Sequence, residues 1–181
     1  MTDQKSINAR VLANTLLMKS IGRSSAAVDK FSVWLFAGFG AAVGLLFANL
    51  DTVLAHVPAT QLQAAVRLFA WSMVATVAQR YLAVVIAAGA AGAEEGRQIF
   101  AASGIPASEV DLDVLLNEMS LALWRPFRWP IRRLNRRLKA GDFAAVGRLV
   151  AKIAQLQGVF VLAQVGLVFA AVHALVFSLA G

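Results

Sequence analysis

Three long apolar blocks constrain the fold of this chain more than any other feature of its sequence. They cover residues 31–50, 66–93 and 153–180, and the first contains no ionisable residue. About 20 apolar residues, each rising ~1.5 Å, cross the hydrocarbon core of a bilayer as a helix. A soluble bundle would instead need a polar face on every helix, which the stretch FAGFGAAVGLLFANL lacks. The sequence therefore predicts an all-α integral membrane protein with three transmembrane helices, accompanied by cytoplasmic or interfacial amphipathic helices.

The composition supports this class and argues against an enzyme. The 181 residues are 59% hydrophobic and 15% charged, against about 45–50% and about 25% in average soluble domains. There is no cysteine, and the two histidines, His56 and His173, lie far apart in the sequence. Neither a thiolate site nor a histidine metal site is therefore expected. Because no phosphate loop, nucleophile elbow or His/Glu metal motif is present, we expect a non-enzymatic protein without a cofactor or metal.

The distribution of positive charge predicts an orientation in the membrane. Residues 1–30 carry five Lys or Arg against two acidic residues, and residues 94–152 carry ten against seven. Residues 51–65 carry only Asp51. Segments rich in Lys and Arg stay on the cytoplasmic side. The N-terminus and residues 94–152 are therefore expected inside and the C-terminus outside, in what we interpret as a bacterial cytoplasmic membrane.

This orientation divides the chain into four parts. The first is a cytoplasmic or interfacial helix, expected to end near Gly22, and the second is a transmembrane hairpin with a short outer loop. A basic cytoplasmic segment follows, in which Pro126 and Pro130 are expected to prevent a regular helix before residue 131. A third span comes last. The four parts are residues 1–30, 31–93 (with spans 31–50 and 66–93), 94–152 and 153–181.

Small residues recur at helical spacing in all three apolar blocks. The glycines singled out by this spacing are Gly40 and Gly44, Gly89 and Gly92, and Gly166. Small residues on one helix face let two backbones approach closely, which drives helix association in lipid. We expect these glycines to lie in helix contacts, either within one chain or between copies, and we expect the protein to self-associate.

Arg80 is the costliest residue in the second block. It lies about 21 Å of helical rise from Glu94, the first charge on the cytoplasmic side, and an arginine at the membrane centre costs ~2.5–3.5 kcal/mol on insertion scales. No carboxylate lies inside the three blocks, so its expected partners are Gln79, Gln164, water, backbone carbonyls or a lipid phosphate. Two interpretations remain open. Arg80 either snorkels to the inner headgroups or faces a water-filled or anion-binding interior made by several copies.

Two further polar residues lie in the third block. Gln164 is expected near the depth of Arg80, and we interpret it as a hydrogen-bonding contact between helices. His173 lies toward the outer end of the block. It is either a hydrogen-bonded interfacial residue or a group that titrates near neutral pH and acts as a switch.

The sequence WRPFRWPIRRLNRRLKAGD gives the cytoplasmic segment a dense basic cluster. Aromatic residues interleave with its cations, and an anionic membrane surface attracts such a cluster by ~1 kcal/mol per basic residue. Nucleic-acid binding and a purely topological role are the alternatives. The position next to a membrane span favours lipid over nucleic acid. The predicted lipid-binding residues are Arg125, Arg128, Arg132, Arg133, Arg136, Arg137 and Lys139.

Together these features predict a non-enzymatic, homo-oligomeric integral membrane protein. One interpretation is a pore or channel assembled from several copies, with a basic segment that binds anionic lipid on the inside. The alternative is a scaffold or accessory subunit of a larger membrane or envelope complex, in which the same segment binds a protein partner. A lipid-modifying enzyme is a third class, for which the sequence offers no catalytic groups.

Overall fold

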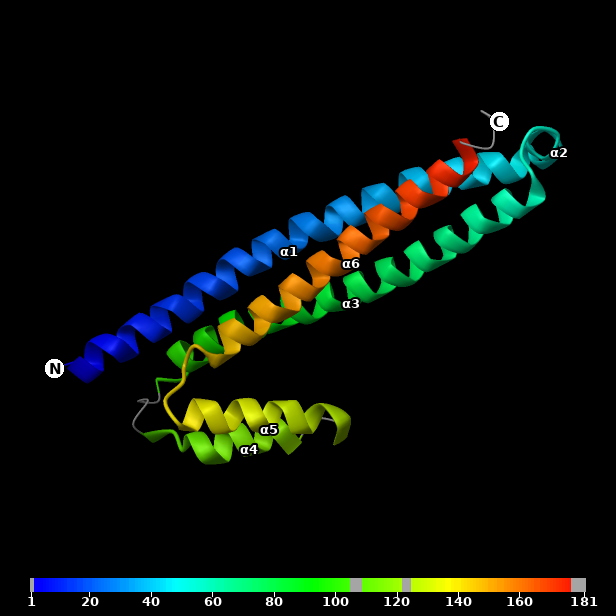
Figure 1. Cartoon of the computed structure of the whole chain (residues 1–181). Coiled ribbons are helices and arrows are strands. Elements are labelled where there is room, and N and C mark those ends of the chain that lie inside the picture. The colour runs from blue at the N-terminus through cyan, green and yellow to red at the C-terminus, as the bar shows by residue number, and fades with distance from the viewer. Residues whose placement is uncertain (1, 105–108, 122–124, 177–181) are drawn as a thin grey trace. The chain divides into compact units, whose positions relative to one another are not determined.

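The computed structural model describes residues 2–104, 109–121 and 125–176, and these ranges contain helices and no strand (Figure 1). The all-α prediction is confirmed. Three of the helices are long and apolar enough to cross a membrane, as predicted. The helices are α1 (Thr2–Ala48), α2 (Leu50–Leu54), α3 (Ala59–Ser103), α4 (Leu112–Leu121), α5 (Arg125–Lys139) and α6 (Ala145–Val176).

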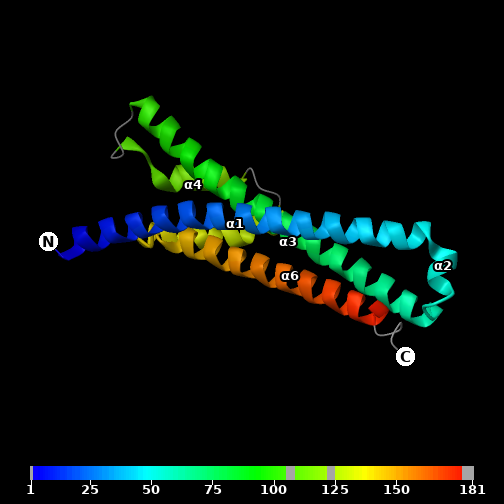
Figure 2. The same cartoon turned by 90° about the horizontal axis from the view of Figure 1, so that it is seen from above.

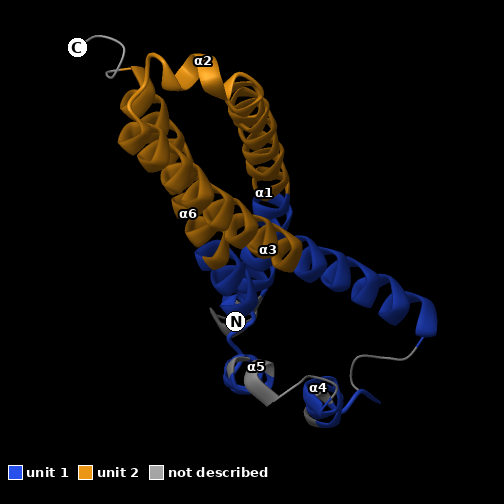
Figure 3. Ribbon diagram, turned by 90° about the vertical axis from the view of Figure 1, so that its right-hand side faces the viewer, with its two compact units in different colours: residues 1–22, 87–152 blue, residues 23–86, 153–181 orange. Residues whose placement is uncertain are grey.

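The chain forms two compact units, coloured separately in Figure 3. Unit 1 comprises Met1–Gly22 and Ala87–Lys152, and unit 2 comprises Arg23–Ile86 and Ile153–Gly181. The division falls within α1, α3 and α6, so each of these helices contributes residues to both units.

Buried residues in unit 2 recur at intervals of seven. On α3 they include Ala65, Ser72, Gln79 and Ile86. On α6 the buried residues Gln157, Gln164 and Ala171 keep the same interval, as do Ser25 and Ser32 on α1. A strict seven-residue repeat keeps one helix face in contact with its neighbours when the helices wind around each other in a left-handed sense. The interior of unit 2 is therefore built like a short coiled coil, although it mixes polar and apolar residues.

Contacts within unit 2 define the directions of its helices. Two serines of α1 each contact a residue of α6 that lies 132 positions later, so α1 and α6 run parallel. The ring of Phe69 on α3 lies 6.2 Å from that of Phe36 and 5.3 Å from that of Phe39. Since α3 returns after a short connection that contains α2 and Pro58, it runs antiparallel to α1 (Figures 1 and 2).

The prediction that the N-terminal helix ends near Gly22 is wrong. α1 is continuous from Thr2 to Ala48. A glycine inside a helix costs only ~1 kcal/mol relative to alanine, which the helix-forming residues on both sides outweigh. A Cβ added to Gly22 would lie 3.8 Å from the Cβ of Ala90, an ordinary packing distance.

In unit 1, α4 and α5 pack against each other. The side chain of Asp111 caps α4 by accepting a hydrogen bond from the backbone N–H of Val114 at 3.2 Å. The side-chain amide of Asn135 on α5 donates to the carbonyl of Leu116 on α4 at 3.1 Å. These two polar contacts fix the start of α4 and its position beside α5.

The expectation that two prolines prevent a regular helix before residue 131 is wrong. α5 begins at Arg125 and continues to Lys139. Pro126 lies in its first turn, where no backbone N–H needs an intrahelical acceptor, and Pro130 removes a single hydrogen bond shortly after it. The helix ends at a turn in which Gly141 has a positive φ of 77°, a conformation that favours glycine.

The start of α6 is capped from another helix. The side-chain oxygen of Asn14 on α1 accepts a hydrogen bond from the backbone N–H of Gly147 at 2.8 Å. A Cβ added to Gly147 would lie 2.8 Å from that oxygen and 3.3 Å from the Cβ of Leu17. Gly147 is therefore the glycine that lets α1 and α6 approach closely in unit 1.

Replacing Gly147 with alanine is expected to destabilise the protein by about 1–3 kcal/mol, because Asn14 must move and its cap is lost. Gly158 on the same helix has no atom within 4 Å of an added Cβ. Gly158→Ala is therefore expected to be neutral or slightly stabilising, since alanine is the better helix former. Thermal unfolding in detergent, followed by circular dichroism, measures both. Equal effects of the two substitutions would contradict the assigned contact.

Candidate functional site

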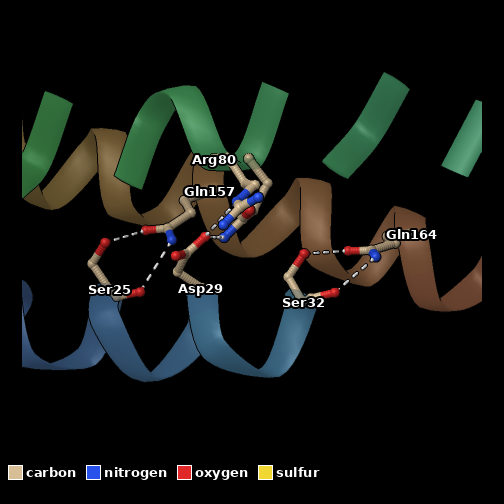
Figure 4. A network of polar contacts seen from close by, with 7 residues as sticks. Ser25, Asp29, Ser32, Arg80, Gln157 and Gln164 are labelled. Carbon is tan, nitrogen blue, oxygen red and sulfur yellow. Dashed lines mark hydrogen bonds and ion pairs between the residues drawn. The ribbon is translucent and has the colours of Figure 1, made fainter. Parts of the chain in front are cut away.

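Two matching pairs of polar residues join α1 to α6 inside unit 2 (Figure 4). The hydroxyl of Ser25 donates to the side-chain oxygen of Gln157 at 2.7 Å, and the amide of Gln157 donates back to the Ser25 carbonyl at 3.3 Å. Ser32 and Gln164 repeat both contacts at the same distances. All four residues are at most 4% exposed. Each pair therefore satisfies its own polar groups away from solvent.

These pairs set the relative position of α1 and α6. Because both pairs join residues 132 apart, they select one alignment of the two helices. Any other alignment would leave buried hydroxyl and amide groups without partners, at a cost of about 1–3 kcal/mol each. The structure thus places Gln164 between two helices, with Ser32 as its partner.

A second polar group joins α1 to α3. The carboxylate of Asp29 lies 3.7 Å from the guanidinium Nε of Arg80. The same carboxylate oxygen accepts a hydrogen bond from the side-chain amide of Gln79 at 3.2 Å. The expectation that Arg80 has no carboxylate partner is therefore wrong. Asp29 precedes the first apolar block by two residues, and because α1 continues through this point as one helix, the antiparallel α3 brings Arg80 beside it.

Gln79 and Arg80 lie in different surroundings although they are adjacent in sequence. Gln79 is fully buried, and its side-chain oxygen accepts no hydrogen bond from the described residues. The Arg80 side chain is 57% exposed and that of Asp29 is 31% exposed. Arg80 therefore lies at the outer surface of unit 2 and does not line an interior of the single chain. The fourth polar residue predicted for the spans, His173, is exposed near the end of α6.

The five glycines predicted to lie in helix contacts have no close neighbour among the described residues, because no atom there lies within 4 Å of a Cβ added to any of them. The prediction allowed contact within one chain or between copies, and the structure gives no support to the first of these. The faces that carry them are open in the monomer, and contact between copies remains a prediction. These glycines are Gly40, Gly44, Gly89, Gly92 and Gly166.

The basic cluster of unit 1 lies largely on the exposed face of α5. Arg132, Arg133, Arg136, Arg137 and Lys139 are exposed. Arg128 is half-buried and donates to the carbonyl of Leu121 on α4 at 2.9 Å, while the side chain of Arg125 lies outside the described residues. Most of the predicted lipid-binding cations are thus accessible.

Aromatic and apolar side chains accompany these cations on the surface of unit 1. Trp129 is 66% exposed, and the guanidinium of Arg133 lies 5.9 Å from the centre of one of its rings. On α4, Val114, Leu115 and Met119 are each more than 40% exposed. The α4–α5 pair therefore presents apolar and cationic groups together.

Sequence reasoning missed Ser25, Ser32, Gln157 and Asp29. The first three carried a usable signal, because the two serines are seven residues apart and so are Gln157 and Gln164. No sequence signal pointed to Asp29, because it falls in the predicted N-terminal part of the chain, which was separated from the span that contains Arg80.

The described ranges contain no group of three or more His, Cys, Asp or Glu residues that could hold a metal ion. No family model, no curated protein and no solved structure matches this chain.

The Ser32–Gln164 pair is expected to show a coupling energy of about 1 kcal/mol, because double-mutant cycles in a membrane protein average ~0.6 and reach ~1.7 kcal/mol. The cycle compares Ser32→Ala, Gln164→Ala and the double variant by unfolding in detergent. Gln155 is exposed on the same helix, so a control cycle of Ser32→Ala with Gln155→Ala should give a coupling near zero. Equal coupling in the two cycles would argue against the pair.

Proposed function

We propose that this chain is a non-enzymatic, homo-oligomeric integral membrane protein that binds anionic lipid through α5. The observation that carries the proposal is the surface of the α4–α5 pair. Four exposed arginines and Trp129 of α5 accompany exposed apolar residues of α4 in the same unit. A pair of helices that exposes both apolar side chains and cations suits the boundary between acyl chains and headgroups.

Electrostatics favours lipid as the ligand of this surface. Each Lys or Arg near an anionic leaflet contributes ~1 kcal/mol of attraction, and tryptophan side chains prefer the headgroup level. The basic segment precedes the third apolar block directly in the sequence, which keeps it close to the bilayer. We assign this side to the cytoplasm, with the C-terminus outside, in a bacterial cytoplasmic membrane.

The spans supply the argument for self-association. Arg80 is more than half exposed beside exposed apolar side chains of the same helix, such as Val77 and Val84, and a charged group facing acyl chains is costly. A neighbouring copy, or snorkelling to the headgroups, removes that cost. The open faces that carry Gly40 and Gly44 would let a second helix approach closely.

Two functions fit such an oligomer. A pore would place Arg80 toward a shared interior, and its exposure on unit 2 supports this candidate. An accessory subunit would use the basic surface to bind a protein partner of a larger membrane complex. The Ser–Gln pairs fill the space between α1 and α6 with satisfied polar groups, so any pore would require several copies.

The lipid-binding proposal predicts a preference for phosphatidylglycerol over phosphatidylcholine in native mass spectrometry of the detergent-solubilised protein. Replacing Arg132, Arg133, Arg136 and Arg137 with glutamine should weaken phosphatidylglycerol binding at least tenfold. The control replaces four cations of α1 and should lose less than threefold; these are Lys5, Arg10, Lys19 and Arg23. Equal losses would show that net charge alone, and not α5, attracts the lipid.

The same preparations test the oligomer and separate the two candidate functions. More than one copy per particle is expected, and a monomer in nanodiscs would contradict self-association. Dye leakage from liposomes that is lost in Arg80→Gln would favour the pore, whereas a tight vesicle and a stoichiometric co-purifying protein would favour the accessory subunit.

A further inference from the structure

Four cations converge on one cleft in unit 1, between α5 and the start of α6. The cleft has a volume of about 360 Å³. Arg133 and Arg137 line it from α5, and Arg148 and Lys152 line it from α6. The last two lie outside the basic cluster that the sequence singled out, and the fold brings them to it.

The charge balance of this cleft favours an anionic ligand. As the structure describes it, none of the lining residues is acidic. Asp142 forms an ion pair with Arg148 and offsets one of the four positive charges. Like charges gathered in one cleft repel each other, and an anion held between them removes that repulsion. Arginine guanidinium groups suit phosphate in particular, because they bind two of its oxygens at once.

The apolar part of the lining indicates an amphiphile. Leu134 and Leu149 line the same cleft, together with Trp129. Lys152 immediately precedes Ile153, where the third apolar block begins, and Arg148 lies one turn earlier on the same helix. Along α6 the cations are therefore followed directly by residues that enter the acyl-chain region. A phosphate with attached hydrocarbon matches this order of charge and apolar surface.

We propose that this cleft binds the phosphate headgroup of an anionic phospholipid, with its glycerol and upper acyl carbons against Leu134, Leu149 and Trp129. The inference rests on the proposed lipid binding and makes it more specific, because it assigns the lipid to one cleft and not to general electrostatic attraction by α5. The volume falls within the ~300–1,000 Å³ of small-molecule sites. Arg132 and Arg136, in contrast, line a different cleft with Asn117 and Ser120 of α4.

That difference provides a matched pair of variants on one helix. Arg133→Gln/Arg137→Gln removes two charges from the cleft, and Arg132→Gln/Arg136→Gln removes two charges at the same spacing outside it. Affinity for phosphatidylglycerol is measured in detergent micelles by native mass spectrometry and by the rise in Tm on lipid addition. We expect at least tenfold weaker binding for the first variant and a clearly smaller loss for the second, because Arg132 and Arg136 contribute only general attraction to the anionic lipid and no contact in the cleft. Lys152→Gln, which leaves α5 intact, should weaken binding about fivefold.

Circular dichroism and monodispersity establish that each variant is folded before its affinity is compared. Equal losses in the two arginine variants, with no effect of Lys152→Gln, would overturn the cleft while leaving general lipid binding in place. If the unmodified protein shows no preference for phosphatidylglycerol over phosphatidylcholine, the proposed function fails as well. Inorganic phosphate that raises Tm as much as the lipid does would identify a soluble phosphate as the ligand and overturn the lipid assignment.

A second experiment measures whether the lipid lies next to Trp129, which binding affinities alone do not report. With the other three tryptophans replaced by phenylalanine, Trp129 is the only remaining tryptophan; these positions are Trp34, Trp71 and Trp124. Phosphatidylglycerol brominated near the headgroup should quench Trp129 in this background, and Arg133→Gln/Arg137→Gln should reduce the quenching at equal lipid. Unchanged quenching would contradict a lipid held by these arginines.

Discussion

The pairing of two serines with two glutamines across α1 and α6 is the interaction on which the rest of unit 2 depends. In the hydrocarbon core of a membrane a buried polar group cannot form a hydrogen bond to water, so it needs a hydrogen-bonding partner within the protein. Ser25–Gln157 and Ser32–Gln164 do this with the same reciprocal geometry. They stabilise one alignment of two parallel helices, and they do so without the glycine contacts that often hold membrane helices together.

The alignment has consequences for the third helix. With α1 continuous through residue 29, the antiparallel α3 brings Gln79 and Arg80 beside Asp29. Gln79 takes the buried position of the seven-residue repeat, and Arg80 takes the exposed one next to it. A charge that would be isolated on a single helix thus gains a counter-charge from another. The Arg80 side chain is still more than half exposed, and this exposed charge supports the proposal that copies of the chain associate.

The all-α class with three long apolar helices could be predicted from the sequence, but little of the candidate functional site could. Blocks such as residues 31–50 reach the length of about 20 residues needed to cross a bilayer, so the three long apolar helices could be predicted directly. The spacing of Gly40 and Gly44 predicts helix contact but does not distinguish a neighbour in the same chain from one in another copy, and no atom of the described residues lies within 4 Å of a Cβ added to either glycine. The seven-residue spacing of Ser25 and Ser32 was visible, but only the fold shows that it matches the spacing of Gln157 and Gln164. The cleft could not be predicted, since Arg148 and Lys152 join Arg133 and Arg137 only through the turn before α6.

The alignment of α1 and α6 is tested most directly by introducing pairs of cysteines, because the chain contains none of its own. In Ser32→Cys/Gln164→Cys the two thiols replace one pair while Ser25–Gln157 still holds the helices. Oxidation in native membranes should cross-link them, so that neither thiol reacts with a maleimide polymer added after denaturation in detergent. Ser25→Cys/Gln164→Cys is displaced by one repeat, ~10 Å along the helix, so its thiols should stay reduced and react with the polymer after denaturation. Cross-linking of the displaced pair as readily as the matched pair would contradict the alignment on which this account is built.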